Sequence, residues 1–72
     1  MKIGDVDFFF NLLQQHGCRV EVIPAGIKIS LTREGRTATR TELWIHLEAA
    51  RHGVPELVEI LFDSLKARLD HS

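Results

Sequence analysis

Residues 17–31 read Gly-Cys-Arg-Val-Glu-Val-Ile-Pro-Ala-Gly-Ile-Lys-Ile-Ser-Leu, and apolar side chains alternate with polar ones on both sides of Pro24-Ala25-Gly26. A period of two is typical of a β-strand with one buried face, and Pro and Gly between two such runs mark a turn, where Gly26 can supply a positive φ. The apolar positions are Cys18, Val20, Val22, Ile27, Ile29 and Leu31. The stretch therefore predicts a β-hairpin over about residues 18–32 with one buried face.

A helix is predicted before the hairpin, over about residues 5–16. Its apolar face comprises Val6, Phe9, Phe10 and Leu13. Asp5 is a candidate N-cap, and Gly17 is placed to end the helix.

Two further helices are predicted after the hairpin, over about residues 41–52 and 55–70. In the first, Leu43, Leu47 and Ala50 follow the 3.6-residue period, Thr39 or Thr41 can cap its start, and Gly53 ends it. The second begins with Pro55 near its first position. Its broad apolar arc comprises Leu57, Val58, Leu61, Phe62, Leu65 and Leu69.

The segment between the hairpin and the second helix leaves the fold with two alternatives. Residues 33–36 (Arg-Glu-Gly-Arg) look like a turn, and residues 37–41 are β-branched enough for a short strand but offer little to bury. The fold class is α+β in both cases. The element order is αββαα if this segment is irregular, or αβββαα if it pairs with the hairpin.

Size and composition indicate one small folded domain over residues 1–72, because 44% of the residues are hydrophobic and 26% are charged. A chain of this size buries only about 60% of the surface that its unfolded form exposes, so a second subunit would add stability. A single cysteine, Cys18, favours a reducing, cytoplasmic compartment. No apolar run approaches the roughly 20 residues that span a bilayer, so no membrane contact is expected.

No residue pattern indicates catalysis, a cofactor or a metal site. His46 and His52 fall on different sides of the same predicted helix, whereas zinc requires three or four converging ligands. Cys18 begins a strand on its apolar side, which favours a buried small hydrophobe over a nucleophile. The serines and carboxylates show no recognisable acid–base spacing, and no glycine-rich phosphate loop is present. We therefore expect a protein that is not an enzyme.

Positive charge is concentrated in residues 28–40, which hold four basic residues and one acidic residue and carry +3 (4 − 1). The whole chain carries −1, so the remainder carries −4 (−1 − 3). Arginine and tryptophan are frequent interface anchors. An equally good interpretation is a solvated turn, with Trp44 covering the edge of the core. The candidate partner-binding residues are Lys28, Ser30, Thr32, Arg33, Arg36, Arg40 and Trp44.

Glycine and apolar positions recur through the chain in a recognisable order. They are Phe9 to Gly17, then Val20, Val22, Gly26, Ile27 and Ile29, then Thr-Glu-Leu at 41–43 and Pro-Glu-Leu at 55–57. This order resembles the small αββαα docking domains at the N-termini of nonribosomal peptide synthetase subunits. The resemblance implies that the hairpin receives a segment of another subunit as an added strand, with basic side chains paired to its acids, and that homodimers occur. It places Lys28, Ser30, Thr32, Arg33 and Arg36 in the receiving region.

The leading hypothesis is a non-catalytic docking module that captures an extended acidic peptide on its hairpin edge. The alternative is a nucleic-acid-associated or phage-type regulatory protein that uses the Arg and Trp surface; nucleic acid is the less favoured partner, since the chain as a whole is not basic. A homodimer is also predicted, from Ile45, Ala49 and Ile60, which lie off the main apolar stripes. If residues 36–41 pair with residues 27–31, that edge is occupied and capture must move to residues 18–23.

Overall fold

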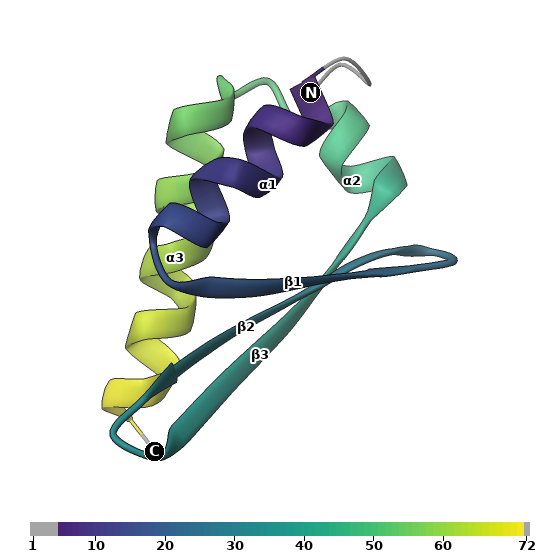
Figure 1. Ribbon diagram of the computed structural model, residues 1–72. Helices are drawn as coiled ribbons and strands as arrows, with labels where there is room; N and C mark the ends of the chain where they lie inside the picture. Colours follow the sequence, from purple (N-terminus) through teal and green to yellow (C-terminus); the bar gives the residue numbers. More distant parts are fainter. Residues whose placement is uncertain (1–4, 72) are drawn as a thin grey trace.

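Three helices and one antiparallel sheet follow one another in the order αβββαα. The computed structural model describes residues 5–71, and its elements are α1 (Val6–Gln15), β1 (Cys18–Ile23), β2 (Gly26–Arg33), β3 (Arg36–Leu43), α2 (Trp44–Ala49) and α3 (Val54–Asp70). The helices lie on one side of the sheet (Figure 1). The α+β class is confirmed, and of the two predicted orders the one with a third strand is correct.

The sheet has the strand order β1-β2-β3, so β2 is the central strand. Cys18, Val20 and Val22 of β1 stand opposite Leu31, Ile29 and Ile27 of β2, respectively. These six residues share the face that is turned toward the helices, as the alternation predicts. On β3, the residues opposite Leu31, Ile29 and Ile27 are Ala38, Arg40 and Glu42.

The core lies between this face of the sheet and the helices. Phe9 and Leu13 of α1, Ile27 and Ile29 of β2 and Leu65 of α3 are fully buried. Of the arc predicted for the last helix, all members are buried except Phe62, which is half-buried. Across residues 5–71, no helix is long and apolar enough to cross a bilayer.

The two chain reversals of the sheet differ in backbone conformation. Glu34 and Gly35, between β2 and β3, have φ values of 53° and 78°, as a type I′ hairpin turn requires. Pro24 and Ala25 connect β1 to β2, so Pro24 lies in the connection as predicted. Gly26 does not have the predicted positive φ; among residues 5–71 the glycines with positive φ are Gly17 and Gly35.

Helix α2 is much shorter than the predicted 41–52. Residues 41–43 continue β3 and pair with residues 26–28 of β2, so the capping roles predicted for Thr39 and Thr41 are wrong. The backbone N–H of Trp44 instead donates to the carbonyl oxygen of Ala25 at 3.0 Å, which joins the start of α2 to the β1–β2 turn. Local helical periodicity is overridden here by the cross-strand ladder.

Helices α1 and α3 agree with their predicted spans within a residue or two. Asp5 precedes α1 as predicted, but its side chain makes no capping hydrogen bond. Gly17 follows α1 with a φ of 86°. Gly53, predicted to end the second helix, is instead the N-cap of α3.

Gly26 is required because two backbone segments approach closely at the end of the sheet. A Cβ atom on Gly26 would overlap the carbonyl oxygen of Glu42 and would lie 2.8 Å from the Cα atom of Leu43. Both neighbours are backbone atoms of β3, so no side-chain rotation can relieve the overlap.

We therefore expect Gly26→Ala to destabilise the fold by about 2–4 kcal/mol, because the strands must separate or shift. Gly53→Ala is the matched control, since its Cβ would meet only the Cδ atom of Pro55 at 3.9 Å. Its expected effect is within about 1 kcal/mol. Urea denaturation of the two variants measures the difference, and equal midpoints would contradict the requirement for glycine at residue 26.

Candidate functional site

The structure does not bring the seven predicted partner-binding residues together. Lys28, Ser30 and Thr32 lie on the outer face of β2, which is turned away from the helices. Arg33, Arg36 and Arg40 belong to the opposite, helix-facing register of β2 and β3. The cause is the strand alternation itself, which places residues an odd number of positions apart on opposite faces.

Ser30 and Thr32 of the outer face take part in hydroxyl contacts with the neighbouring strand. The hydroxyls of Ser30 and Thr39 lie 3.3 Å apart, and those of Thr32 and Thr37 lie 2.9 Å apart. These contacts join β2 to β3 across the exposed face. They add to the stability of the sheet, in which the backbone of β2 is enclosed because the strand lies between β1 and β3.

Two of the predicted arginines contact α3. The guanidinium carbon of Arg33 lies 5.4 Å from the ring centroid of Phe62, a cation–π distance. Arg40 pairs with Glu42 and also donates to the hydroxyl of Ser64 at 2.6 Å. Arg40 is therefore engaged in tying β3 to α3.

Trp44 is half-buried at the start of α2 and packs against the hydrophobic core. This position agrees with the alternative interpretation, in which the indole covers the edge of the core. Trp44 adjoins the β1–β2 turn, at the other end of β2 from the arginines of the β2–β3 turn, so it does not form one continuous surface with them.

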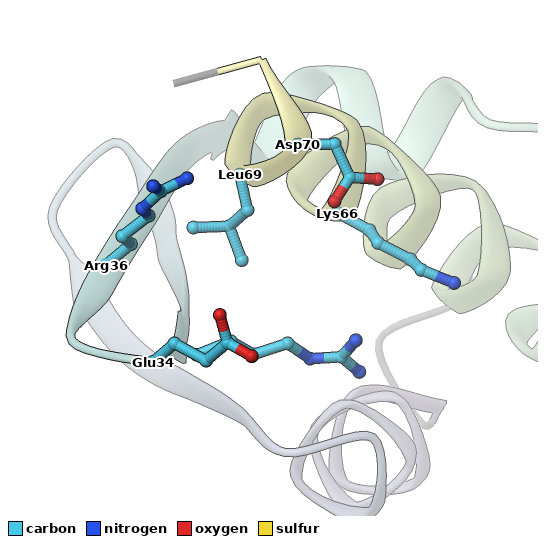
Figure 2. Close-up of a pocket in the computed structure, with 6 residues that line it drawn as sticks. Glu34, Arg36, Lys66, Leu69 and Asp70 are labelled. Atoms are coloured by element: carbon cyan, nitrogen blue, oxygen red, sulfur yellow. The ribbon is translucent and has the colours of Figure 1, made fainter.

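A hollow of about 300 Å³ lies between the β2–β3 turn and the end of α3 (Figure 2). Its lining residues are Arg33, Glu34, Arg36, Lys66, Leu69 and Asp70. Three cations and two carboxylates line it, and Figure 2 shows Lys66 extending away from Arg36. Because these charges do not converge on one point, the hollow lacks the geometry of an anion site.

Metal binding and nucleophilic chemistry receive no geometric support. Within the described residues, no group of three His, Cys, Asp or Glu side chains is placed to hold a metal ion. His52, in the connection before α3, lies 3.4 Å from the exposed carboxylate of Glu56 in the first turn of α3. Cys18 is a buried free thiol with 4% of its surface exposed.

The outer edge of β1 is the candidate binding site. Arg33 and Arg36 flank the type I′ turn and therefore form a hydrogen-bonded pair. The ladder then alternates along β2, whose even-numbered residues from 26 to 32 direct their backbone groups toward β1. Their partners on β1 are the odd-numbered residues. It follows that the N–H and C=O groups of Val20 and Val22 point away from the sheet.

The two edges of the sheet differ in how far they are covered. On β3, the carbonyl oxygen of Thr39 accepts a hydrogen bond from the guanidinium of Arg68 on α3. On β1, the end of the strand near the β1–β2 turn is exposed to solvent, since Val22 has 62% of its surface exposed. An edge strand with unpaired backbone groups and an exposed apolar side chain is a template for strand addition.

Residues 36–41 pair with β2, so within the part of the chain that the structure describes the free edge of the hairpin belongs to β1. The residues that face this edge on the outer side are Arg19 and Glu21, neither of which is among the seven candidates. Their alternating charges were visible in the sequence. The pairing of β3 was the missing information, because it removes β2 from the edge.

Comparison with known proteins identifies no relative. No protein-family model matches the sequence, and neither a curated protein nor a solved structure is significantly similar to the chain. The resemblance to synthetase docking domains therefore stays a prediction.

Removing Arg40 should destabilise the fold, because Arg40→Ala leaves the largely buried carboxylate of Glu42 without its partner and removes a bond to α3. We expect a loss of about 1–3 kcal/mol in the free energy of unfolding. Arg51→Ala changes the same charge in the exposed segment between α2 and α3, and its effect should stay within about 0.5 kcal/mol. Equal urea midpoints for Arg40→Ala and Arg51→Ala would show that the Arg40 contacts do not contribute to stability.

The buried thiol of Cys18 predicts a loss of stability at alkaline pH. Burial raises its pKa, and the positive charge of Arg33 opposes the rise. Because the folded thiol keeps its proton to higher pH than the unfolded thiol, its contribution is complete below the unfolded pKa and is lost as the pH rises through the folded pKa. Urea unfolding from neutral to alkaline pH should show this loss in the native protein, and Cys18→Ala should lack it. If the native protein and Cys18→Ala lose stability identically with rising pH, Cys18 is not the cause of the loss.

Proposed function

We propose that the protein is a non-catalytic interaction module that binds an extended segment of a partner protein along the outer edge of β1. The observation that carries the proposal is that, among residues 5–71, β1 has β2 on one side only, which leaves the backbone groups of Val20 and Val22 pointing away from the sheet. In strand addition, backbone hydrogen bonds supply affinity, and alternate side chains supply specificity. The module needs no cofactor for this role.

The side chains of β1 define the segment that would fit. On the helix-facing side, Val20 and the exposed Val22 favour apolar residues in the partner. On the outer side, Arg19 favours an acidic residue opposite it, and Glu21 favours a basic one. The fitting segment therefore alternates apolar and charged residues, and its charges have both signs.

A generally acidic peptide has less support than the sequence suggests. Lys28 lies on the central strand, and Arg33 and Arg36 flank the turn at which β2 leads into β3, the strand farthest from β1. The cations that the acidic-peptide hypothesis requires are thus not gathered along the free edge. An alternating segment uses the charges that are present there.

Nucleic acid remains a weaker candidate. Contact with phosphates requires several cations on one surface. Around the hollow at the β2–β3 turn, Glu34 and Asp70 offset the cations. On the outer face, Lys28 stands opposite Glu21.

The proposal is tested by selecting binders from a library of random linear peptides and mapping them by NMR on the isotope-labelled protein. We expect the amide signals of Val20 and Val22 to shift most and to gain protection from hydrogen exchange, because their N–H groups would donate to the peptide. Shifts confined to the hollow near Arg36 and Lys66 would contradict binding at β1.

Two proline variants provide matched arms of the same test. Val22→Pro removes an edge donor that the ladder to β2 does not use, so the fold should persist while peptide binding falls by about tenfold. Thr41→Pro makes the same change on the other edge strand, β3, and should leave binding unchanged. Circular dichroism confirms that each variant is folded. Equal loss of affinity in both variants would overturn the choice of edge.

A further inference from the structure

The strand β1 itself has the sequence that its own edge would accept. Apolar Cys18, Val20 and Val22 alternate with Arg19 and Glu21, which carry opposite charges. We infer that β1 pairs with β1 of a second copy, antiparallel and centred on Val20, so that two three-stranded sheets become one continuous sheet. This inference rests on the proposed role of the β1 edge as a strand acceptor, with a second copy of the chain as the added strand.

The charges select this register among those available. With Val20 opposite Val20 of the second copy, Arg19 faces the second copy's Glu21, and the reverse pair forms by symmetry. A centre at Arg19 would oppose two arginines, and a centre at Glu21 would oppose two glutamates, which is destabilising. A slip by one residue would turn the apolar face of one strand toward the outer side of the other.

The backbone geometry agrees with the same register. The N–H and C=O groups of Val20 and Val22 point away from β2, so these positions can exchange hydrogen bonds with the second copy. Arg19 and Glu21 then occupy the non-hydrogen-bonded positions, where opposite Cα atoms are closer, at about 4.5 Å. Close approach strengthens a cross-strand ion pair.

Pairing would also extend the apolar helix-facing side and the alternating charges of the outer face, both of which are already present in the monomer. Val22, with 62% of its surface exposed, would lie beside the second copy's Cys18, whose side chain is buried under the helices. On the outer face, Glu21 already stands opposite Lys28 of β2. The second copy's Arg19 would place a cation on its other side, so that charges alternate in sign across the joined sheet.

Self-pairing would regulate the proposed function, since a partner segment must displace the second copy from the same edge.

The β1–β1 contact also differs from the dimer surface predicted from Ile45, Ala49 and Ile60. Ile45 and Ile60 lie on α2 and α3 with 68% and 43% of their surfaces exposed. The two dimer contacts therefore respond to different substitutions.

Sedimentation equilibrium of charge-swapped variants tests the register. Arg19→Glu alone opposes two glutamates at each paired position, and Glu21→Arg alone opposes two arginines, so each variant should dimerise at least about tenfold more weakly than the native protein. An equimolar mixture of R19E and E21R restores opposite charges at both positions. The mixture should recover dimers, and raised salt should weaken the recovery.

Failure to recover dimers in the mixture would overturn the proposed register. So would a Val22→Pro variant that dimerises as strongly as the native protein. Circular dichroism of each variant shows whether the monomer is folded, because E21R also brings an arginine opposite Lys28. If the native protein stays monomeric at every concentration while selected peptides still shift the β1 amides, self-pairing is wrong and the proposed function stands. If no peptide shifts those amides, the strand-acceptor role itself fails.

Discussion

The central position of β2 is the constraint on which the rest of the structure depends. Each backbone polar group of a central strand is committed to one neighbour or the other, so β2 can offer none of them to a partner. The same pairing register also fixes which side chains of the three strands face the helices, and it places Ile27 and Ile29 in the core. Gly26 extends the same requirement to the end of the sheet, where β3 approaches so closely that no side chain fits.

Much of the fold could be predicted from local patterns. The alternation from Cys18 to Leu31 predicts the buried face of the hairpin, and the arc from Leu57 to Leu69 predicts the packed face of α3. Residues 41–43 could not be assigned in this way, because Thr-Glu-Leu suits either a strand or the start of a helix. Their pairing with residues 26–28 decides the outcome, and that pairing joins segments far apart in the sequence.

The candidate site was less predictable than the fold for a related reason. Lys28, Arg33, Arg36 and Arg40 are close in sequence, which suggests a single basic surface. In the folded chain, strand alternation directs Lys28 to the outer face, while Phe62 and Glu42 engage Arg33 and Arg40 on the other. A count of charge along the chain contains no information about these partners. The location of a free edge is likewise a property of the whole sheet.

The two edges show how a small sheet can be open on one side only. Arg68 contacts the carbonyl of Thr39 and partly blocks β3, whereas β1 carries neither a proline nor a run of like charges within the strand. A run of like charges protects an edge against a second copy of the same strand, because the charges repel in every register. Opposite charges two residues apart, as in Arg19 and Glu21, instead discriminate between registers: they penalise most alignments and favour a strand with the complementary order. An edge of this kind is selective, and a domain with so little core gains stability from each strand that it accepts.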